Sequence, residues 1–384
     1  MTAIIFIAIL GLLVLVHEAG HFFVARKNGV KVEEFGFGIP PRMFGVWRDK
    51  KNPSPKTAQD ARRKWHFVTK VTEHNKPPET IYSINWLPIG GFVKIKGEDG
   101  NETGPDSFSQ KKLWQRSIIV VAGVTMNFLL TIVLLAIGFG IGIPEALNGK
   151  VPANATIRDR HIEITTVLKG SPAAQAELKA GDTIETIDGK TFGNLDEARV
   201  YIKESTKPLA IEIKRDGVRE TKIATTVFLE ETKARGLGVG LLETALVSYP
   251  WHIAAWKGVT ESFRMFGEII KSFYHVFKNI FSGQGVSADL SGPVGIAVLT
   301  GKAARLGFVY LLQLAALLSL NLAFINAMPF PALDGGRLLF FAIEAITGKP
   351  VKKEREQLAH TIGFFILLAL IAIVTFRDIS HLIK

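Results

Sequence analysis

The first apolar stretch of the chain reads TAIIFIAILGLLVLVHEAGHFFVA and runs from Thr2 to Ala25. It is long enough to cross a bilayer, which takes roughly 20 apolar residues in an α-helix. It has no basic residue at its start, unlike a signal peptide, and it continues through two histidines and a glutamate. Ionisable side chains are costly inside a membrane, so these three residues indicate a functional site within a spanning helix.

Three further stretches are apolar and near or above the length of a membrane span: 117–143, 306–328 and 359–376. Hydrophobic residues make up 47% of the 384 residues and charged residues 21%, which excludes a disordered chain and is unusual for a soluble enzyme. The chain has no cysteine, so a disulfide framework and a thiolate metal site are also excluded. The sequence predicts a mainly α-helical membrane protein with four transmembrane helices.

The charges of the loops predict the orientation of these helices. Residues 25–116 contain 18 Lys and Arg against 10 Asp and Glu, whereas residues 144–250 are close to neutral. Because basic loops stay in the cytoplasm, we expect the first loop inside, the second loop outside and both termini outside. The net charge of +11 is then explained by a lipid bilayer, and no nucleic-acid partner is expected.

The pattern along the chain predicts four regions. Charged residues recur through 251–281, which favours a helix lying at the membrane surface over a fifth span. Residues 1–143 are predicted to form a membrane domain with the first two spans, and 144–250 an extracytoplasmic α/β domain. Residues 251–300 are predicted to form an interfacial amphipathic helix region, and 301–384 a membrane domain with the last two spans.

Two short stretches, 35–44 and 81–96, mix aromatic residues, β-formers, Gly and Pro, and they are too broken to span a membrane. We expect them to form membrane-associated β-strands beside the first helix. The polar segment between them, 51–80, is interpreted as a cytoplasmic insertion to which the sequence assigns no function.

The extracytoplasmic region contains GSPAAQAELKAGDTIETIDGK at residues 170–190, which resembles a PDZ domain of the bacterial, protease-associated kind. The resemblance implies a groove in which a peptide or a C-terminus adds a strand to a sheet edge. A filter that excludes bulky proteins and a generic small α/β module are the alternatives.

His17, Glu18 and His21 fit the pattern H-E-x-x-H. On a helix the two histidines lie one turn apart on one face, so both imidazoles can bind one Zn²⁺ ion. Glu18 follows the first histidine and can act as the general base toward water at the metal. The alternative is a polar helix end, which is costly in a membrane because the side chains would lack partners.

A catalytic zinc ion takes three protein ligands and leaves one position open, so a third ligand is needed. The best candidate is Asp334, in the sequence NAMPFPALDGGR at 326–337, where two prolines end the third span. The predicted topology brings Asp334 to the same cytoplasmic side as His17 and His21; a plain helix-stop turn is the alternative. The remaining histidines are expected mostly at the surface: His66, His74, His161, His252, His275, His360 and His381.

These motifs together resemble the site-2 protease family of intramembrane zinc metalloproteases, in the bacterial M50-type branch represented by the regulator of sigma-E protease. H-E-x-x-H lies in the first span, N-x-x-P-x-P-x-L-D-G-G occupies 326–336, and the PDZ-like region lies between the second and third spans. The resemblance implies one zinc ion held by His17, His21 and Asp334, with Glu18 as the general base.

The same resemblance implies substrate-binding roles for further residues. Asn326 matches an asparagine that holds the substrate or its developing oxyanion, and Gly90, Gly91 and Phe92 match a membrane-inserted β-loop that pairs with an unwound substrate. The stretch 291–295 matches another segment of the family. This chain has one PDZ-like unit, whereas the best-known relatives have two, and the 51–80 insertion has no counterpart.

The resemblance implies a zinc endopeptidase of the bacterial inner membrane. It would cut single-span membrane proteins such as anti-sigma factors or signal-peptide remnants, with the active site toward the cytoplasm and the PDZ domain outside. A catalytically idle PDZ membrane adaptor is the main alternative, but such a relative is expected to lack Glu18 or a ligand. A proton- or metal-coupled transporter is disfavoured by the small number of spans and the lack of an internal repeat.

Overall fold

The computed structural model describes residues 2–48, 64–69, 77–98, 102, 104–147, 154–215, 217–229, 233–282 and 292–383. Most of the predicted 51–80 insertion and Ser291 lie outside these residues. The chain divides into two compact units: one combines Met1–Leu135 with Lys257–Lys384, and the other is Ala136–Trp256.

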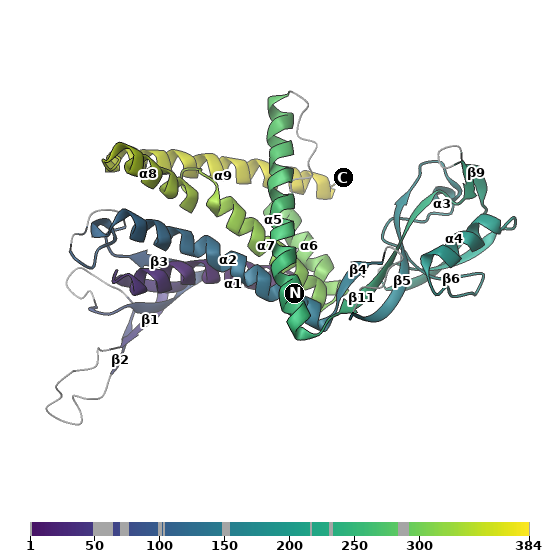
Figure 1. Ribbon diagram of the computed structural model, residues 1–384, viewed down its shortest axis with the longest axis horizontal. Coiled ribbons are helices and arrows are strands. Elements are labelled where there is room, and N and C mark those ends of the chain that lie inside the picture. The colour runs from purple at the N-terminus through teal and green to yellow at the C-terminus, as the bar shows by residue number, and fades with distance from the viewer. Residues whose placement is uncertain are drawn as a thin grey trace. The chain divides into compact units, whose positions relative to one another are not determined.

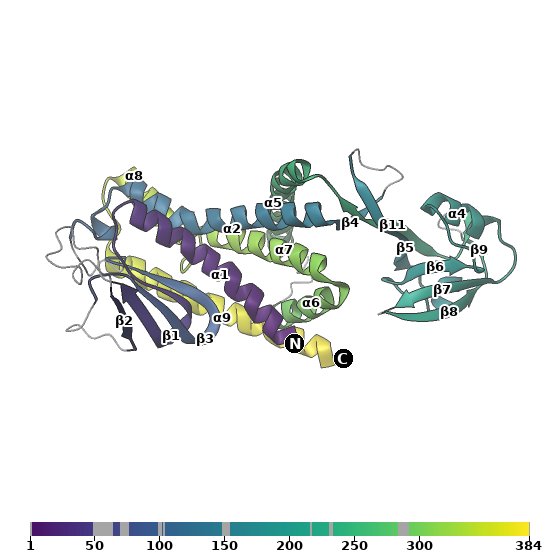
Figure 2. The same ribbon diagram turned by 90° about the horizontal axis from the view of Figure 1, so that it is seen from below.

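Among the described residues, four helices are long and apolar enough to cross a membrane, as the sequence predicts. They are α1 (Thr2–Lys27), α2 (Leu113–Ile141), α7 (Phe308–Ala327) and α9 (Lys353–Ile383). In the first unit, α1 and α2 run side by side in opposite directions in both views (Figures 1 and 2). Gly20 permits this close approach, because a Cβ atom there would lie 2.4 Å from the carbonyl oxygen of Ala122.

Three further helices are α5 (Trp251–Phe281), α6 (Pro293–Leu306) and α8 (Asp334–Thr347). The sequence did not predict α6 or α8 as separate helices. The first turn of α6 is fixed by α9, because the Asp378 carboxylate accepts hydrogen bonds from the backbone N–H groups of Gly292 (3.2 Å) and Gly295 (2.7 Å). A carboxylate at a helix N-terminus also interacts favourably with the helix dipole.

The first unit also contains a sheet of three strands, β1 (Val32–Arg48), β2 (Trp65–Val68) and β3 (Ile81–Ile95), in the order β2-β1-β3. Both long strands fold back on themselves, so Phe37 pairs with Gly91 and also with Ile84. The last part of β3, Gly91–Ile95, therefore forms an outer edge of the sheet within the described residues.

The second unit is built on a six-stranded sheet in the order β4-β11-β5-β6-β7-β8. Its strands are β4 (Ile143–Ala146), β5 (Thr156–Val167), β6 (Thr183–Ile187), β7 (Leu209–Arg215), β8 (Val218–Ala224) and β11 (Val239–Ser248). A two-stranded sheet of β9 (Val227–Leu229) and β10 (Ala234–Gly236) accompanies it, with helices α3 (Pro172–Gln175) and α4 (Leu195–Glu204).

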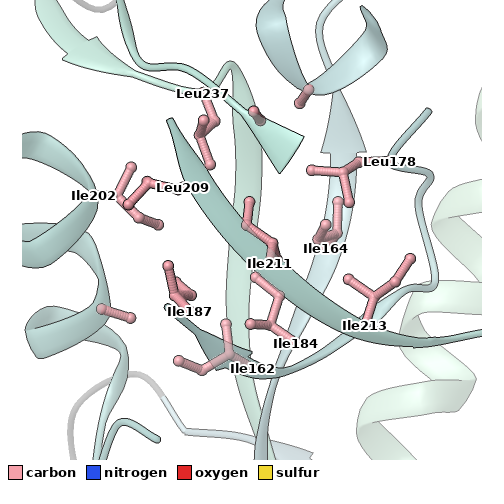
Figure 3. Packing of buried hydrophobic residues seen from close by; sticks show 13 residues of the cluster. Ile162, Ile164, Leu178, Ile184, Ile187, Ile202, Leu209, Ile211, Ile213 and Leu237 are labelled. Atoms are coloured by element: carbon pink, nitrogen blue, oxygen red, sulfur yellow. The ribbon is translucent and has the colours of Figure 1, made fainter. Parts of the chain in front are cut away.

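Alternating apolar residues of these strands form the core of the second unit. Ile211 and Ile213 of β7 are fully buried and cluster with Ile187 of the adjacent strand β6 and with Ile164 of β5 (Figure 3). Helix α4 starts at a reciprocal cap, because the Asn194 side chain accepts from the Glu197 N–H while the Glu197 carboxylate accepts from the Gly193 N–H. The unit thus has a core of its own.

Candidate metal centre

Two histidines of α1 converge on one point inside the first unit. His17 and His21 are buried, and their Nε2 atoms lie 3.2 Å apart. The spacing of four residues puts both rings on the same face of the helix. Glu18 is half-buried and lies next to His17 in the chain.

Asp334 reaches the same point from the first residue of α8. Its Oδ2 atom lies 3.1 Å from Nε2 of His17 and 3.2 Å from Nε2 of His21. Burial alone would raise the pKa of Asp334, but the two imidazoles beside it hold that pKa below its usual value. A carboxylate must be ionised to bind a metal, and a lowered pKa favours that form.

The three side chains fit a zinc ion. Zinc takes imidazole nitrogen and carboxylate oxygen as ligands, and tetrahedral ligand atoms about 2.0–2.1 Å from the ion lie about 3.3 Å from each other. The separations of 3.1 to 3.2 Å among the two Nε2 atoms and Oδ2 agree with that value. The three donors can occupy three corners of a tetrahedron and leave the fourth open.

Helix α2 shapes the other side of this centre. The Nδ1–H group of His21 donates to the carbonyl oxygen of Ile119 at 2.8 Å, which leaves the Nε2 lone pair free to bind a metal. A Cβ atom at Gly123 would lie 2.4 Å from Nε2 of His21 and 2.7 Å from Cε1 of His17. Only glycine leaves room for both rings here.

The loop that delivers Asp334 is supported by α9. The backbone N–H of Ala332 donates to Nδ1 of His360 at 2.9 Å, and Ala332 has a φ of 78°, which a non-glycine residue rarely adopts. A Cβ atom at Gly363 would lie 2.4 Å from the carbonyl oxygen of Pro331, so the loop packs directly on the α9 backbone.

A cavity of about 350 Å³ opens beside the three ligand candidates. Its walls come from α1, the edge strand β3, α2, α8 and α9, and it is lined by His17, Glu18, His21, Phe92, Val93, Ile95, Glu98, Phe108, Ile119, Val120, Ala332, Leu333, Asp334, Arg337 and His360. Arg337 forms an ion pair with Glu98, which links α8 to the end of β3. Burial would lower the pKa of Arg337, but the Glu98 carboxylate outweighs that effect and raises it.

The structure brings together most of the residues that the sequence singled out. Glu18 and Phe92 line the same cavity as the three ligand candidates. Gly90 and Gly91 lie beside α1, with Val14 and Leu15 as their neighbours, and they do not line the cavity. Asn326 is half-buried in the last turn of α7 and also lies outside the lining.

Other residues at the centre were missed. The prediction that the remaining histidines lie mostly at the surface is wrong for His360, which is half-buried, caps the Asp334 loop and lines the cavity. Gly123 was also missed, although a small residue within an apolar span is a recognised sign of close helix packing. Ile119 carried no signal, because it acts through its backbone carbonyl.

Two histidines one turn apart, an adjacent glutamate and a carboxylate ligand define the metallopeptidase class of site. The chain belongs to peptidase family M50, which matches residues 5–54 and 61–370. The zinc metalloprotease RasP of Bacillus licheniformis is 30% identical over 99% of this chain and 99% of its own length. A protein of Clostridium acetobutylicum is 32% identical over 98% of this chain and 97% of its own length.

Among solved structures, the PDZ domain of an SdrC-like protein from Listeria monocytogenes aligns with 24% of this chain and 92% of its own length, at 26% identity and a TM-score of 0.20. Membership of family M50 and the zinc metalloprotease relatives identify this protein as a metalloprotease that uses zinc.

Proposed function

We propose that the protein is an intramembrane endopeptidase of the site-2 protease type, which cuts single-span membrane proteins within or near their membrane segment. One observation carries the proposal: two of the three ligand candidates belong to α1, a helix apolar and long enough to span a bilayer. A site built from such a helix is suited to peptide bonds at membrane depth. Anti-sigma factors and signal-peptide remnants are the substrates that the family resemblance suggests.

His17, His21 and Asp334 hold the zinc ion in this proposal. Bound there, zinc polarises the scissile carbonyl and makes water a better nucleophile. Glu18 lines the same cavity, where its carboxylate accepts the proton of the attacking water and passes it to the leaving amine. Asn326, at the end of α7, is proposed to donate its amide to the substrate backbone near the cleaved bond.

The edge of the β3 strand presents the substrate. A peptide bond inside a transmembrane helix is hydrogen-bonded within that helix, so the helix must unwind before the bond can be attacked. An unpaired strand edge offers replacement backbone partners. Within the part of the chain that the structure describes, Gly91–Ile95 is such an edge, and Phe92, Val93 and Ile95 line the cavity, so a strand paired there lies next to the zinc ligands.

The orientation follows from the charges of the chain. His17 and His21 lie in the second half of α1, which ends at Arg26 and Lys27. We propose that this end faces the cytoplasm of a bacterial inner membrane and that the PDZ-like unit lies outside. In that unit a groove of about 1400 Å³ lies between α4 and β11, and we propose that it binds a peptide or a C-terminus.

The test is cleavage of a single-span substrate by the purified protein in lipid vesicles. Glu18→Gln is expected to keep about one zinc ion per chain and to lose cleavage by a factor on the order of 10² to 10⁴, because the carboxamide cannot accept the proton. Gln175→Glu, a change of the same size on the PDZ-like unit, serves as the control. Full cleavage by Glu18→Gln would exclude the assigned mechanism. Loss of zinc from the Glu18→Gln protein would show that Glu18 also helps to hold the metal and is not solely a general base.

A further inference from the structure

Asn127 of α2 is fully buried next to the metal centre. Its exposed fraction is 0%, and its Nδ2 atom lies 3.4 Å from Nδ1 of His17. Its Oδ1 atom is buried and has no hydrogen-bond partner among the described residues. A buried amide oxygen without a partner is unfavourable, so this arrangement calls for an explanation.

The protonation of the His17 ring can explain why the Asn127 amide oxygen has no partner. A neutral imidazole has one N–H group and one lone pair, so a ring that binds a metal through Nε2 carries its proton on Nδ1. Nδ1–H would then face the NH₂ group of Asn127, with two donors in contact. The oxygen and nitrogen of a side-chain amide are nearly indistinguishable by shape, and a half-turn of the amide exchanges them. Oδ1 then accepts the Nδ1–H of His17 and gains its missing partner.

The same arrangement already exists at the other histidine. Nδ1–H of His21 donates to the carbonyl oxygen of Ile119, eight residues before Asn127 on α2. Gly123, which makes room for both rings, lies midway between them. Residues spaced by four share one face of a helix, so a single face of α2 holds both acceptors and the space for the two imidazoles.

The backbone of Asn127 is fixed by its neighbours. Its carbonyl oxygen accepts hydrogen bonds from the hydroxyl of Thr131 at 3.0 Å and from that of Ser319, on α7, at 2.8 Å. The Thr131 hydroxyl also donates to the carbonyl oxygen of Ala316 at 3.2 Å. The amide therefore stands at a set place relative to α1.

We propose that Asn127 is a positioning residue: its side-chain oxygen accepts the Nδ1–H of His17, which fixes the ring orientation and leaves the Nε2 lone pair for zinc. The inference rests on the proposed zinc site at His17, His21 and Asp334. Partners of this kind commonly change metal affinity by about 10- to 100-fold when they are removed.

The test measures zinc affinity of the full-length protein in detergent, by competition with a chelator. Asn127→Leu keeps the size and removes the acceptor, and it is expected to weaken zinc binding by about 10- to 100-fold. Asn127→Asp keeps an acceptor at the same place and is expected to bind zinc at least as tightly as the unchanged protein. Thr125→Val removes an exposed hydroxyl of the same helix that donates to the Val121 carbonyl four residues back, and it is the matched control with unchanged affinity.

A spectroscopic measurement separates positioning from packing. In protein labelled with ¹⁵N at histidine, the Nδ1–H signal of His17 should be present in the unchanged protein and in Asn127→Asp, and shifted or lost in Asn127→Leu. Unchanged zinc affinity in Asn127→Leu would overturn the inference, as would equal loss in Asn127→Asp. If the unchanged protein itself bound no zinc, the proposed zinc site would be wrong. That outcome differs from one in which only the role of Asn127 is wrong.

Discussion

Gly123 illustrates how one residue can determine whether the centre forms at all. It has no side chain at the point where α2 meets both imidazoles, and the nearest ring atoms lie 2.4 to 2.8 Å from the position of a Cβ atom. Real Cβ contacts are not that short, so a side chain there must displace a ring. The metal centre therefore requires the space left by the missing side chain at Gly123 as well as the ligand candidates themselves.

Gly123→Ala is therefore expected to weaken zinc binding on the order of tenfold or more, because the methyl group displaces the rings of His17 and His21. Zinc per chain after dialysis against a mild chelator measures the effect. Gly267→Ala, on α5, is the control, since no atom lies within 4 Å of its Cβ position. Normal zinc retention by Gly123→Ala would show that the rings can move aside.

The sequence reveals the residues that carry the chemistry better than those that hold them in place. The spacing of His17 and His21 follows directly from helix geometry, and the topology of the spans pointed to Asp334. The roles of Gly123, Asn127 and His360 depend on which face each helix turns toward α1. An almost uniformly apolar helix does not encode that face in its hydrophobic pattern, so the structure was needed.

Between α7 and α8, the loop 328–333 connects two helices and places Asp334, the third ligand candidate. His360 on α9 accepts the N–H of Ala332, two residues before Asp334. The conformation of the loop thus depends on α9, which is neither of the two helices, α7 and α8, that the loop connects. The motif at 292–295 has a similar explanation, because Asp378 of the same α9 accepts two N–H groups there.

His360→Leu is expected to destabilise the protein by about 1–3 kcal/mol, because the Ala332 N–H loses its acceptor in a half-buried place. Zinc binding should weaken as well, since the loop that bears Asp334 is loosened. Thermal unfolding and zinc affinity are the measurements. His360→Asn should restore much of both, because its amide oxygen lies at about the position of Nδ1, whereas Thr361→Val, at the next residue, should change neither.

In the PDZ-like unit, Asp182 lies directly before β6, binds Arg215 at the end of β7, and contributes to the way stability varies with pH. It is 1% exposed and accepts two hydrogen bonds from Arg215, both at 2.7 Å. Burial would raise the pKa of Asp182, but the hydrogen bonds from Arg215 and from the Lys179 N–H lower it. A lowered folded-state pKa means that this stabilisation is present above the ordinary carboxyl pKa of about 4 and is lost below it.

Asp182→Asn is expected to lower the stability of the excised domain, residues 154–249, by roughly 2 kcal/mol at neutral pH. The difference from the unchanged domain should shrink as the pH falls below about 4, since Asp182 of the unfolded chain becomes protonated there while the folded carboxylate is still ionised. Urea unfolding at a series of pH values measures this. A difference that stays constant down to pH 3 would contradict the assignment to Asp182.

At the scale of the whole molecule, the chain divides into a unit with the metal centre and a unit inserted between Ala136 and Trp256. The apolar runs of the first unit and the PDZ-like stretch 170–190 of the second unit were visible in the sequence. The folded-back pairing of β1 with β3 was not, because register between distant segments is a tertiary property.

Removing most of the second unit is expected to leave the zinc content unchanged, because all the ligand candidates belong to the first unit. Residues 148–242 can be replaced by Asn-Gly, since the Leu147 N–H donates to the Glu243 carbonyl at 2.8 Å and the two strands already pair. Cleavage of a panel of substrates should change in selectivity. Loss of zinc from this shortened protein would show that the two units are not independent.

The free edge at Gly91–Ile95 has a consequence for what such a protease can recognise. Pairing along a strand edge uses main-chain groups, which every residue except proline supplies in full. Discrimination would then depend on how easily a membrane helix comes apart, rather than on a particular run of side chains. With the proposed intramembrane activity, proteins whose spans contain helix-breaking residues would be cut first, and one enzyme could act on many unrelated targets that share only an unstable helix.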